Sequence, residues 1–329
     1  MGISRRALLA HAGTATLVAS LMPASAETAT YLYDALGRLV RVTYSGGTIV
    51  VYDYDAAGNR SRTCRTDGST FVATIQVAGT GPVNLRTLAD ASGYCGVTDA
   101  TITFQVGSAV TIMGAPGGGP GIDTGVWPTD KTISLALQVS GKVYGGGGAG
   151  AAGAGTSGAL QGGVGGDAVR CQHNISITVN SGGQIRAGGG GGGGGGAWHR
   201  EQNYEGVPTW FVYTGGGGGG GFPNGPGGPG GEYGEHGFSR GQPGSNGTTS
   251  GGGAGGAGGN AGIGRTTGAG GAGAGAAATG SSGVGASGTE DATAVKFAAS
   301  PGGGPGYAIR KNGHAVSVTN NGTISGTVG

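Results

Sequence analysis

Hydrophobic and polar residues alternate in several short stretches of the chain, and this alternation predicts β-strands. One such stretch is TITFQVGSAVT, residues 101–111. Three further phrases share one formula: an alternating strand, a turn rich in Ser, Asn and Gly, and a short second strand that ends in glycine. They are ISLALQVSGKVYGGGG from Ile133, ISITVNSGGQIRAGGGG from Ile175 and VSVTNNGTISG from Val316. Because the phrases recur at unequal spacing, we expect one framework with inserts of variable length between its parts.

A short helix is predicted over residues 83–91, VNLRTLADA, where apolar residues recur at helical spacing. The glycines of the following SGYCG are typical of a helix end. Together with the strand at 101–111 and the loop GAPGGGPG at 114–121, this helix predicts a small mixed module over residues 67–131. We expect the module to attach the rest of the chain to a partner.

A turn phrase occurs twice near the start of the chain, as YDALGR at 33–38 and as YDAAGNR at 54–60. The alternating residues between the two copies predict a β-hairpin within residues 27–66, with the aspartates at turns. The phrase resembles the YD repeat of Rhs-type surface proteins, which build large shells from many copies. One hairpin is expected to serve as a spacer or as a docking strand. The repeat explains Asp53 and Asp55 as turn residues rather than as catalytic or calcium-binding carboxylates.

Composition excludes an ordinary hydrophobic core over most of the length, because 86 of the 329 residues are Gly and 12 are Pro. Only 10% of the residues are charged, and the formal net charge is +2. This charge argues against nucleic-acid binding through a basic surface.

The first 26 residues are predicted to be an export signal, with Arg5 and Arg6 before an apolar run and the small residues ASA before Glu27. The phrase SRRALLA is similar to a twin-arginine signal. A general secretory signal that carries two arginines is the alternative. In either case the mature chain is expected to leave the cytoplasm, and no later stretch is apolar enough to span a membrane.

Three cysteines, Cys64, Cys95 and Cys171, are spaced too widely for a metal or redox motif. In an oxidising compartment we expect a bridge between Cys64 and Cys95, because both lie in the part of the chain that is poor in glycine. The alternative is three small buried residues. No metal site and no cofactor are predicted.

Long runs of glycine allow two interpretations. The first is a flexible linker, because glycine has no side chain to offset the entropy lost on ordering. The second is polyglycine type II geometry, in which short helices pack closely through their backbones. Glycines 188–196 and 215–221 would span about 28 and about 22 Å at about 3.1 Å per residue, and these matched lengths favour packing.

The predicted fold class is therefore mostly irregular with short β-strands. It consists of a packed polyglycine type II helix bundle over residues 132–329 that bears distal loops, preceded by the small mixed module and the β-hairpin. Such a bundle offers no side chains for recognition, so recognition would fall to the segments that interrupt the glycine runs. Eight of the 20 aromatic residues lie between Trp198 and Phe238, within these interruptions.

The order of these elements resembles the receptor-recognising adhesins at the tip of the long tail fibres of T-even-like bacteriophages. The resemblance covers roughly residues 80–329 and includes CQHNISITVNSGGQIRAGGGGGGGGG and the closing NNGTISG. It implies that residues 197–214 and 222–250 are distal loops that bind an outer-membrane protein of a host bacterium. The implied contact residues are Trp198, His199, Tyr204, Trp210, Phe211, Tyr213, Phe222, Tyr233, His236 and Phe238. The alternative is that the aromatic residues form a local cluster that seals one end of the bundle.

The export signal and the YD hairpin depart from that resemblance, because virion proteins assemble in the cytoplasm. They indicate a bacterial relative or a prophage-derived module at the cell surface, exported or extracellular, whereas a phage-encoded chain would lie at a fibre tip. The expected partners are a bacterial outer-membrane protein or surface glycan, and a fibre or cell-surface scaffold bound through the N-terminal region. No nucleic acid is expected.

Two other functions compete with the adhesin hypothesis. An enzyme is disfavoured because no catalytic spacing links the five histidines: His11, His173, His199, His236 and His314. Ice binding or a structural role at the cell surface is the stronger alternative. An ice-binding face would need regular short Ala and Thr positions, and a structural protein would self-associate through unpaired strand edges.

Overall fold

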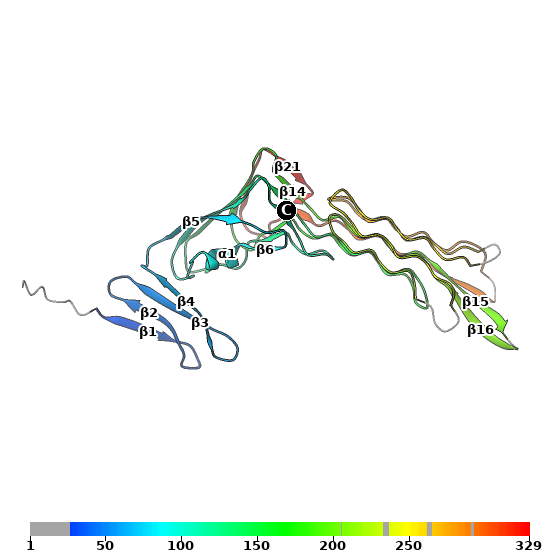
Figure 1. The fold of residues 1–329 in the computed structure, drawn as a ribbon, viewed down its shortest axis with the longest axis horizontal. Coiled ribbons are helices and arrows are strands. Elements are labelled where there is room, and N and C mark those ends of the chain that lie inside the picture. Colours follow the sequence, from blue (N-terminus) through cyan, green and yellow to red (C-terminus); the bar gives the residue numbers. More distant parts are fainter. Residues whose placement is uncertain (1–26, 205, 233–236, 262–264, 291–292) are drawn as a thin grey trace, which may run out of the picture. The chain divides into compact units, whose positions relative to one another are not determined.

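The computed structural model describes residues 27–204, 206–232, 237–261, 265–290 and 293–329. The chain divides into two compact units, Met1–Asp67 and Gly68–Gly329. Within the described residues, 22 strands form five sheets, and the one helix, α1 (Leu85–Ala91), has seven residues (Figure 1). No helix in these ranges has the length and apolar character to cross a membrane.

The first unit is a four-stranded antiparallel sheet in chain order: β1 (Ala29–Tyr33), β2 (Leu39–Tyr44), β3 (Ile49–Tyr54) and β4 (Arg60–Thr66). Strands β2 and β3 form the predicted hairpin. The repeat of the turn phrase is matched by a repeat in how the strands pair. Leu32 lies opposite Arg41 and Asp53 lies opposite Arg62, and in both pairs the next residue begins a register shift.

Asp34 and Asp55 of the repeated phrase act as turn residues, as predicted, whereas Asp53, also expected at a turn, lies within β3. A carboxylate oxygen of Asp34 accepts hydrogen bonds from the backbone amides of Leu36 and Arg38, at 3.0 and 2.9 Å. Asp55 accepts in the same way from the amide of Asn59 at 2.8 Å. These backbone hydrogen bonds, from Arg38 and Asn59, lower the pKa of both carboxyl groups.

The second unit is built on three parallel sheets, which we call the framework. The first sheet contains β5 (Phe71–Val77), β7 (Ala100–Val106), β10 (Ile133–Val139), β13 (Ile175–Val179) and β20 (Val316–Asn320). The second contains β8 (Thr111–Met113), β11 (Lys142–Tyr144), β14 (Gln184–Arg186) and β21 (Thr323–Ser325). The third contains β6 (Val83–Asn84), β9 (Ile122–Asp123), β12 (Val169–Arg170), β19 (Tyr307–Arg310) and β22 (Thr327–Val328).

From β7 onward the chain visits these sheets in a repeated order, first, second, third, so that each round stacks on the one before. The three phrases predicted from the sequence lie in successive rounds, and Ile177 is paired with Leu137 on one side and with Val318 on the other. Residues 100–113 form an earlier round, because β7 pairs with β10 and β8 pairs with β11. Residues 67–131 therefore share their sheets with the later phrases and do not form a module of their own.

The hydrophobic core fills the space between the three sheets. Alternate residues of each strand point inward, and Phe104, Leu137, Ile177, Ile112 and Ile185 are fully buried there. Each fully buried side chain of this size contributes about 1.5–3 kcal/mol relative to an exposed one. The two-residue alternation of the phrases is the pattern that this inward and outward arrangement requires.

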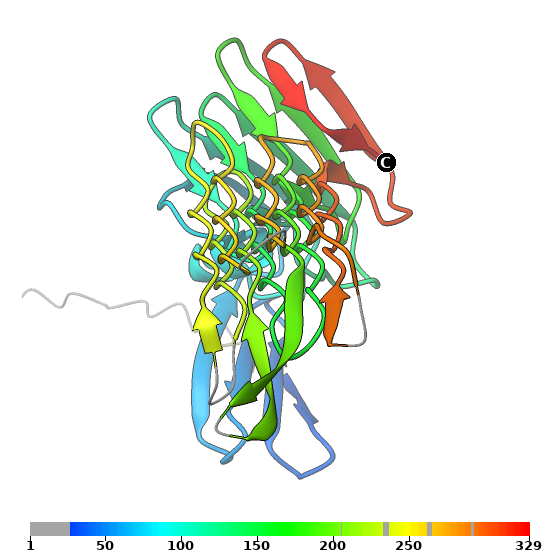
Figure 2. The same cartoon turned by 90° about the vertical axis from the view of Figure 1, so that its right-hand side faces the viewer.

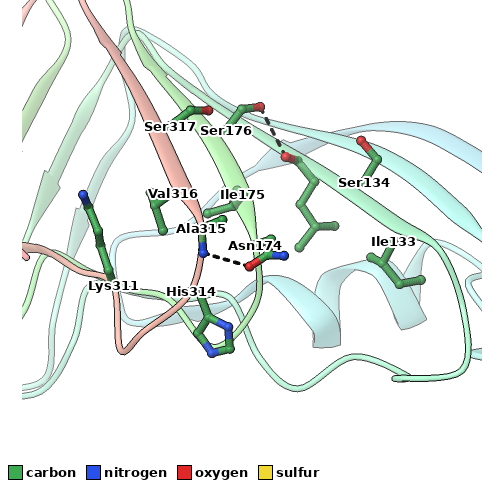
Figure 3. A pocket seen from close by; sticks show the side chains of 11 residues that line it. Ile133, Ser134, Asn174, Ile175, Ser176, Lys311, His314, Ala315, Val316 and Ser317 are labelled. Carbon is green, nitrogen blue, oxygen red and sulfur yellow. Dashed lines mark hydrogen bonds between the residues drawn. The ribbon is translucent and has the colours of Figure 1, made fainter.

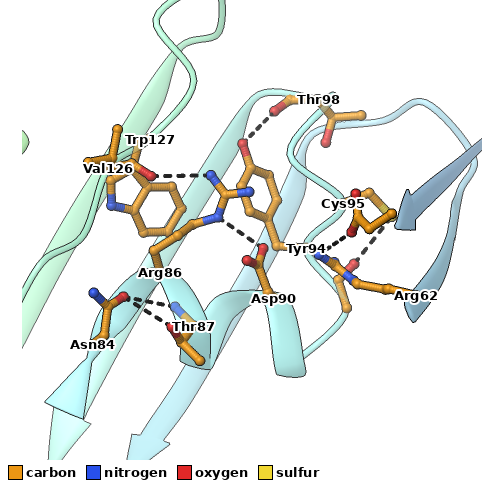
Figure 4. A network of polar contacts seen from close by, with 12 residues as sticks. Arg62, Asn84, Arg86, Thr87, Asp90, Tyr94, Cys95, Thr98, Val126 and Trp127 are labelled. Carbon is orange, nitrogen blue, oxygen red and sulfur yellow. Dashed lines mark hydrogen bonds and ion pairs between the residues drawn. The ribbon is translucent and has the colours of Figure 1, made fainter. Parts of the chain in front are cut away.

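Helix α1 matches the predicted helix and covers the start of the framework. It begins after Asn84, whose side-chain oxygen accepts a hydrogen bond from the amide of Thr87 at 3.0 Å. Figure 4 shows that Arg86, on its first turn, lies between two aromatic rings. The guanidinium carbon is 5.0 Å from the ring centre of Tyr94 and 5.4 Å from that of Trp127, an arrangement that adds cation–π attraction to the packing.

The glycine-rich segments are inserts in this framework. They all leave between a strand of the second sheet and the next strand of the third sheet, at residues 114–121, 145–168 and 187–306. Since successive rounds stack, inserts from neighbouring rounds begin and end side by side. Where the two longer inserts return, Arg310 and Asp167 form an ion pair at 2.5 Å.

The glycine segments run side by side (Figure 2), and backbone hydrogen bonds join them to one another. Along residues 188–196, successive amides donate in rotation to three neighbouring segments, within residues 160–166, 216–222 and 278–284, at 2.8–3.3 Å. Every third amide therefore meets the same neighbour. A Cβ at any of these nine positions would lie closer than 3.0 Å to a neighbouring backbone atom, so only glycine permits this approach. The flexible-linker alternative does not describe these segments.

The predicted fold class, mostly irregular with a polyglycine type II helix bundle, is wrong. The described chain is a β-structure with 22 strands in five sheets and one short helix. The prediction did place the strand phrases in one framework, but it took them as short strands beside a glycine bundle that forms the main structure. Phrases separated by up to 120 residues of insert instead pair as neighbours and build continuous sheets, as β14 and β21 do.

Candidate functional site

The segments that interrupt the glycine runs gather at the two ends of those runs. At the end remote from the framework lies a sheet with the strand order β17-β16-β15-β18, which we call the distal sheet (Figure 1). Its strands are β15 (Ala197–Tyr204), β16 (Val207–Tyr213), β17 (Gly237–Ser239) and β18 (Ala294–Phe297). Strands β15 and β16 form an antiparallel hairpin that continues the glycine segments on both sides.

A buried aromatic cluster anchors the distal sheet. It consists of Trp198, Phe211 and Tyr213 from the hairpin, packed with Ala261 from a later loop and Ala294 from β18. Trp198 is fully buried. A Trp side chain in such a cluster stabilises the fold by about 3–5 kcal/mol relative to alanine.

Polar contacts connect the later loops to the same cluster. The indole Nε1 of Trp198 donates to the carbonyl oxygen of Ser287 at 2.9 Å. The guanidinium of Arg265 lies 5.2 Å from the Trp198 ring centre and donates to the carbonyl oxygen of Thr289. Thr266 pairs with Ser287 through both backbone and hydroxyl groups. Loops far apart in sequence are thereby held in fixed positions.

His199 connects the hairpin to two further segments. Its Nε2 lies 2.5 Å from the carbonyl oxygen of Gly155, in the loop of the first long insert. Its ring centre lies 4.2 Å from that of Phe297 on β18. We therefore assign His199 to the assembly of the distal end, where it bridges segments about 40 and 100 residues away.

Several of the predicted contact residues are buried rather than exposed. Trp198, Phe211 and Tyr213 are at most 7% exposed, which agrees with the alternative that aromatic residues seal this end. Phe222 is also buried, but it lies at the framework end of the runs, where its ring centre is 5.1 Å from that of Tyr144. These four side chains pack inside the protein because their apolar area is removed from water there.

The remaining predicted contact residues fall where side chains are not described. Tyr204, Trp210 and Phe238 lie on β15, β16 and β17, and their side chains are outside the description. Tyr233 and His236 lie outside the described residues.

Sequence reasoning missed the exposed apolar residues of the distal end. Val207 at the hairpin turn is 62% exposed, Val295 on β18 is 44% exposed, and Leu160 in the first loop is 62% exposed. Beside β18 lies a pocket of about 410 Å³ whose lining includes Glu290, Lys296 and Phe297. Their position in the sequence could have indicated them, because each of these residues lies in a segment that interrupts the glycine-rich region.

A second pocket, of about 690 Å³, lies on the framework rather than at the distal end (Figure 3). It crosses the first residues of β10, β13 and β20, and its lining includes Asn174, Lys311 and His314. The Asn174 side chain accepts a hydrogen bond from the amide of Ala315 at 2.9 Å. This contact fixes the corner between the third and first sheets, and we assign the pocket no chemistry.

The cysteines and the groups that could bind a metal bear on two of the sequence predictions within the described residues. Cys171 is a free, fully buried cysteine, and burial raises the pKa of its thiol to about 12. Within the described ranges, no group of three His, Cys, Asp or Glu residues has the geometry of a metal site. The bridge between Cys64 and Cys95 stays a prediction.

Two family models match the chain. The model described as phage tail fibre adhesin Gp38 matches residues 70–329, and the model described as RHS repeat matches residues 33–70. A solved structure is entitled "Crystal structure of the gp37-gp38 adhesin tip complex of the bacteriophage S16 long tail fiber". It is similar over 77% of this chain and 81% of its own, with 23% sequence identity and a TM-score of 0.45. No curated protein matches the chain.

Loops held on a rigid support are typical of binding proteins, and the distal end of this molecule has that construction. The adhesin model covers more than half of the residues. The chain therefore belongs to the family of phage tail fibre adhesins, Gp38, and carries an RHS repeat ahead of the adhesin region. It is a receptor-binding adhesin, and the family points to binding rather than to catalysis.

Proposed function

We propose that the outer surface of the distal sheet and its neighbouring loops contacts the receptor, and that the receptor is an outer-membrane protein or a surface glycan of a bacterium. The observation that supports this most is the anchoring of these loops to the buried Trp198 cluster. Anchored loops lose little conformational entropy on binding, so their exposed side chains can contribute fully to affinity.

The proposal divides the distal residues into two groups. Trp198, Phe211 and Tyr213 hold the surface in shape from inside. Val207, Val295 and the charged pocket residues Glu290 and Lys296 supply contacts on the outside. The sequence adds five candidate contacts whose side chains are not described: Tyr204, Trp210, Tyr233, His236 and Phe238.

The N-terminal part is proposed to carry export and attachment. Residues 1–26, which lie outside the described ranges, would direct the chain out of the cytoplasm. The RHS-repeat sheet of residues 27–67 would hold the adhesin on a cell-surface scaffold or a fibre. The family name supports a fibre, whereas the predicted signal supports the cell surface.

The test is binding of the labelled chain to a panel of bacterial cells. Replacing residues 203–208 with a two-residue Asn-Gly turn shortens the β15–β16 hairpin and should abolish binding, while the melting temperature stays close to that of the wild type. The matched control is Thr249→Ala, in an exposed turn at the opposite end of the glycine runs, which should leave binding intact.

Two pretreatments of the cells identify the receptor class. Protease treatment should remove binding if the receptor is a protein, and periodate treatment should remove it if the receptor is a glycan. Undiminished binding by the folded, hairpin-shortened variant would contradict the proposed site.

A further inference from the structure

The sheet of residues 27–67 has an open edge at β1. This strand is the first in the order β1-β2-β3-β4, so β2 is its one paired neighbour among the described strands. Its side chains are well exposed, 56% for Tyr31 and Tyr33 and 48% for Leu32. Edge strands normally carry charged residues or proline to prevent pairing with other chains, whereas residues 28–33, TATYLY, contain neither.

The hydrogen-bond pattern shows which backbone groups face that edge. The amide of Ser45 donates to the carbonyl oxygen of Thr28 at 2.8 Å. In an antiparallel pair, bonded and non-bonded residues alternate, so Thr30 also faces β2. The N–H and C=O groups of Ala29 and Tyr31 therefore point away from β2.

The internal repeat specifies what fits this edge. The β1–β2 pair and the β3–β4 pair have the same register, including the shift after Leu32 and after Asp53. Strand β1 thus stands in its repeat where β3 stands in the next. Strand β3 pairs on its other side with β2, with Val50 opposite Val42. A strand of the β2 type from another repeat would pair with β1 in the same way.

We propose that the β1 edge binds the last strand of an RHS-repeat sheet in a partner polypeptide, in the antiparallel register that β2 and β3 use within this chain. The occupant is a strand of this type because the repeat makes the two edges of each unit complementary. This interaction is separate from receptor binding by the distal sheet. It gives the adhesin a specific attachment to a surface protein built from the same repeat.

The experiment uses the full chain and a fluorescein-labelled peptide of residues 28–46, TATYLYDALGRLVRVTYSG, which presents a β2-type strand. Fluorescence anisotropy should show saturable binding. Residue-resolved hydrogen exchange should show new protection at the amides of Ala29 and Tyr31, while Thr30 and Leu32, already bonded to β2, change little.

Two substitutions sharpen the test. Tyr31→Pro removes an outward N–H without removing a bond to β2, and it should weaken peptide binding roughly tenfold. Tyr31→Val keeps the donor and should bind nearly as the wild type does. Both variants should still bind receptor-bearing cells, which shows that they are folded and separates this proposal from the one for the distal sheet.

Absence of peptide binding would overturn the proposal, as would equal binding by Tyr31→Pro. Self-association of the chain alone, with protection of the same two amides, would make a second copy the occupant and would also overturn it.

Discussion

Replacing Gly191 with alanine should destabilise the second unit strongly. Its Cβ would lie closer than 3.0 Å to backbone atoms of Ala149 in a neighbouring segment, and no side-chain rotation can move these atoms aside. Overpacking of this kind costs about 1–3 kcal/mol. The displaced segment would also strain two hydrogen bonds, from the Gly191 amide to Gly163 and from the Gly303 amide to Gly191, at 2.9 and 2.8 Å. Each bond contributes about 0.5–1.5 kcal/mol, so we expect a total loss of about 2–6 kcal/mol.

The matched control is Gly304→Ala, on an adjacent segment. A Cβ there meets no atom within 4 Å, and alanine restricts the unfolded chain, which should stabilise the fold by about 0.4–1 kcal/mol. Differential scanning calorimetry should show a melting temperature lower by about 5–15 °C for Gly191→Ala and unchanged or slightly raised for Gly304→Ala. Equal melting temperatures for the two variants would refute the view that backbone proximity requires glycine.

Three further outcomes follow from the structure. Because burial holds the pKa of the Cys171 thiol near 12, above its ordinary value of 9.0, the contribution of this thiol to stability is complete below pH 9 and is lost as the pH rises toward 12. Cys171→Ala should reduce this alkaline loss of stability, measured by chemical denaturation at pH 8 and pH 11, and an unchanged loss would contradict the expectation. Trp198→Ala should lower stability by about 3–5 kcal/mol and impair cell binding, whereas Val207→Ala should weaken cell binding at unchanged stability; equal melting temperatures would refute this division of roles. Mass spectrometry of the unreduced, digested protein should find a peptide pair joined through Cys64 and Cys95, and alkylation of both thiols without prior reduction would disprove the predicted bridge.

Local features of the fold could be predicted from the sequence because local rules determine them. The alternating phrases are strands, α1 begins at a capping Asn84, and Asp34 and Asp55 form turns. The stacking of the phrases could not be predicted in the same way. Pairing of β14 with β21 joins residues more than 130 positions apart, and periodicity within each phrase says nothing about which phrase it will meet.

The location of the receptor-binding loops stays a prediction. Some interruptions of the glycine runs lie at the distal end, as the β15–β16 hairpin does, whereas Phe222 lies at the framework end against Tyr144. An aromatic side chain in such a segment can face water or pack inside, and the sequence around Trp198 is the same in both cases. Its burial depends on Ala261, Ser287 and Ala294, which lie 60 to 100 residues further along the chain.

The contacts among the glycine segments involve backbone atoms, which are identical in every residue. The glycine segments therefore place no requirement on the side chains of the loops that they carry. A loop of different sequence or length can replace an existing one without compensating substitutions in the segments beneath it, provided that the anchoring cluster is kept. Receptor preference and fold stability are thereby separated, so that the binding surface of such an adhesin can diversify rapidly while its support stays unchanged.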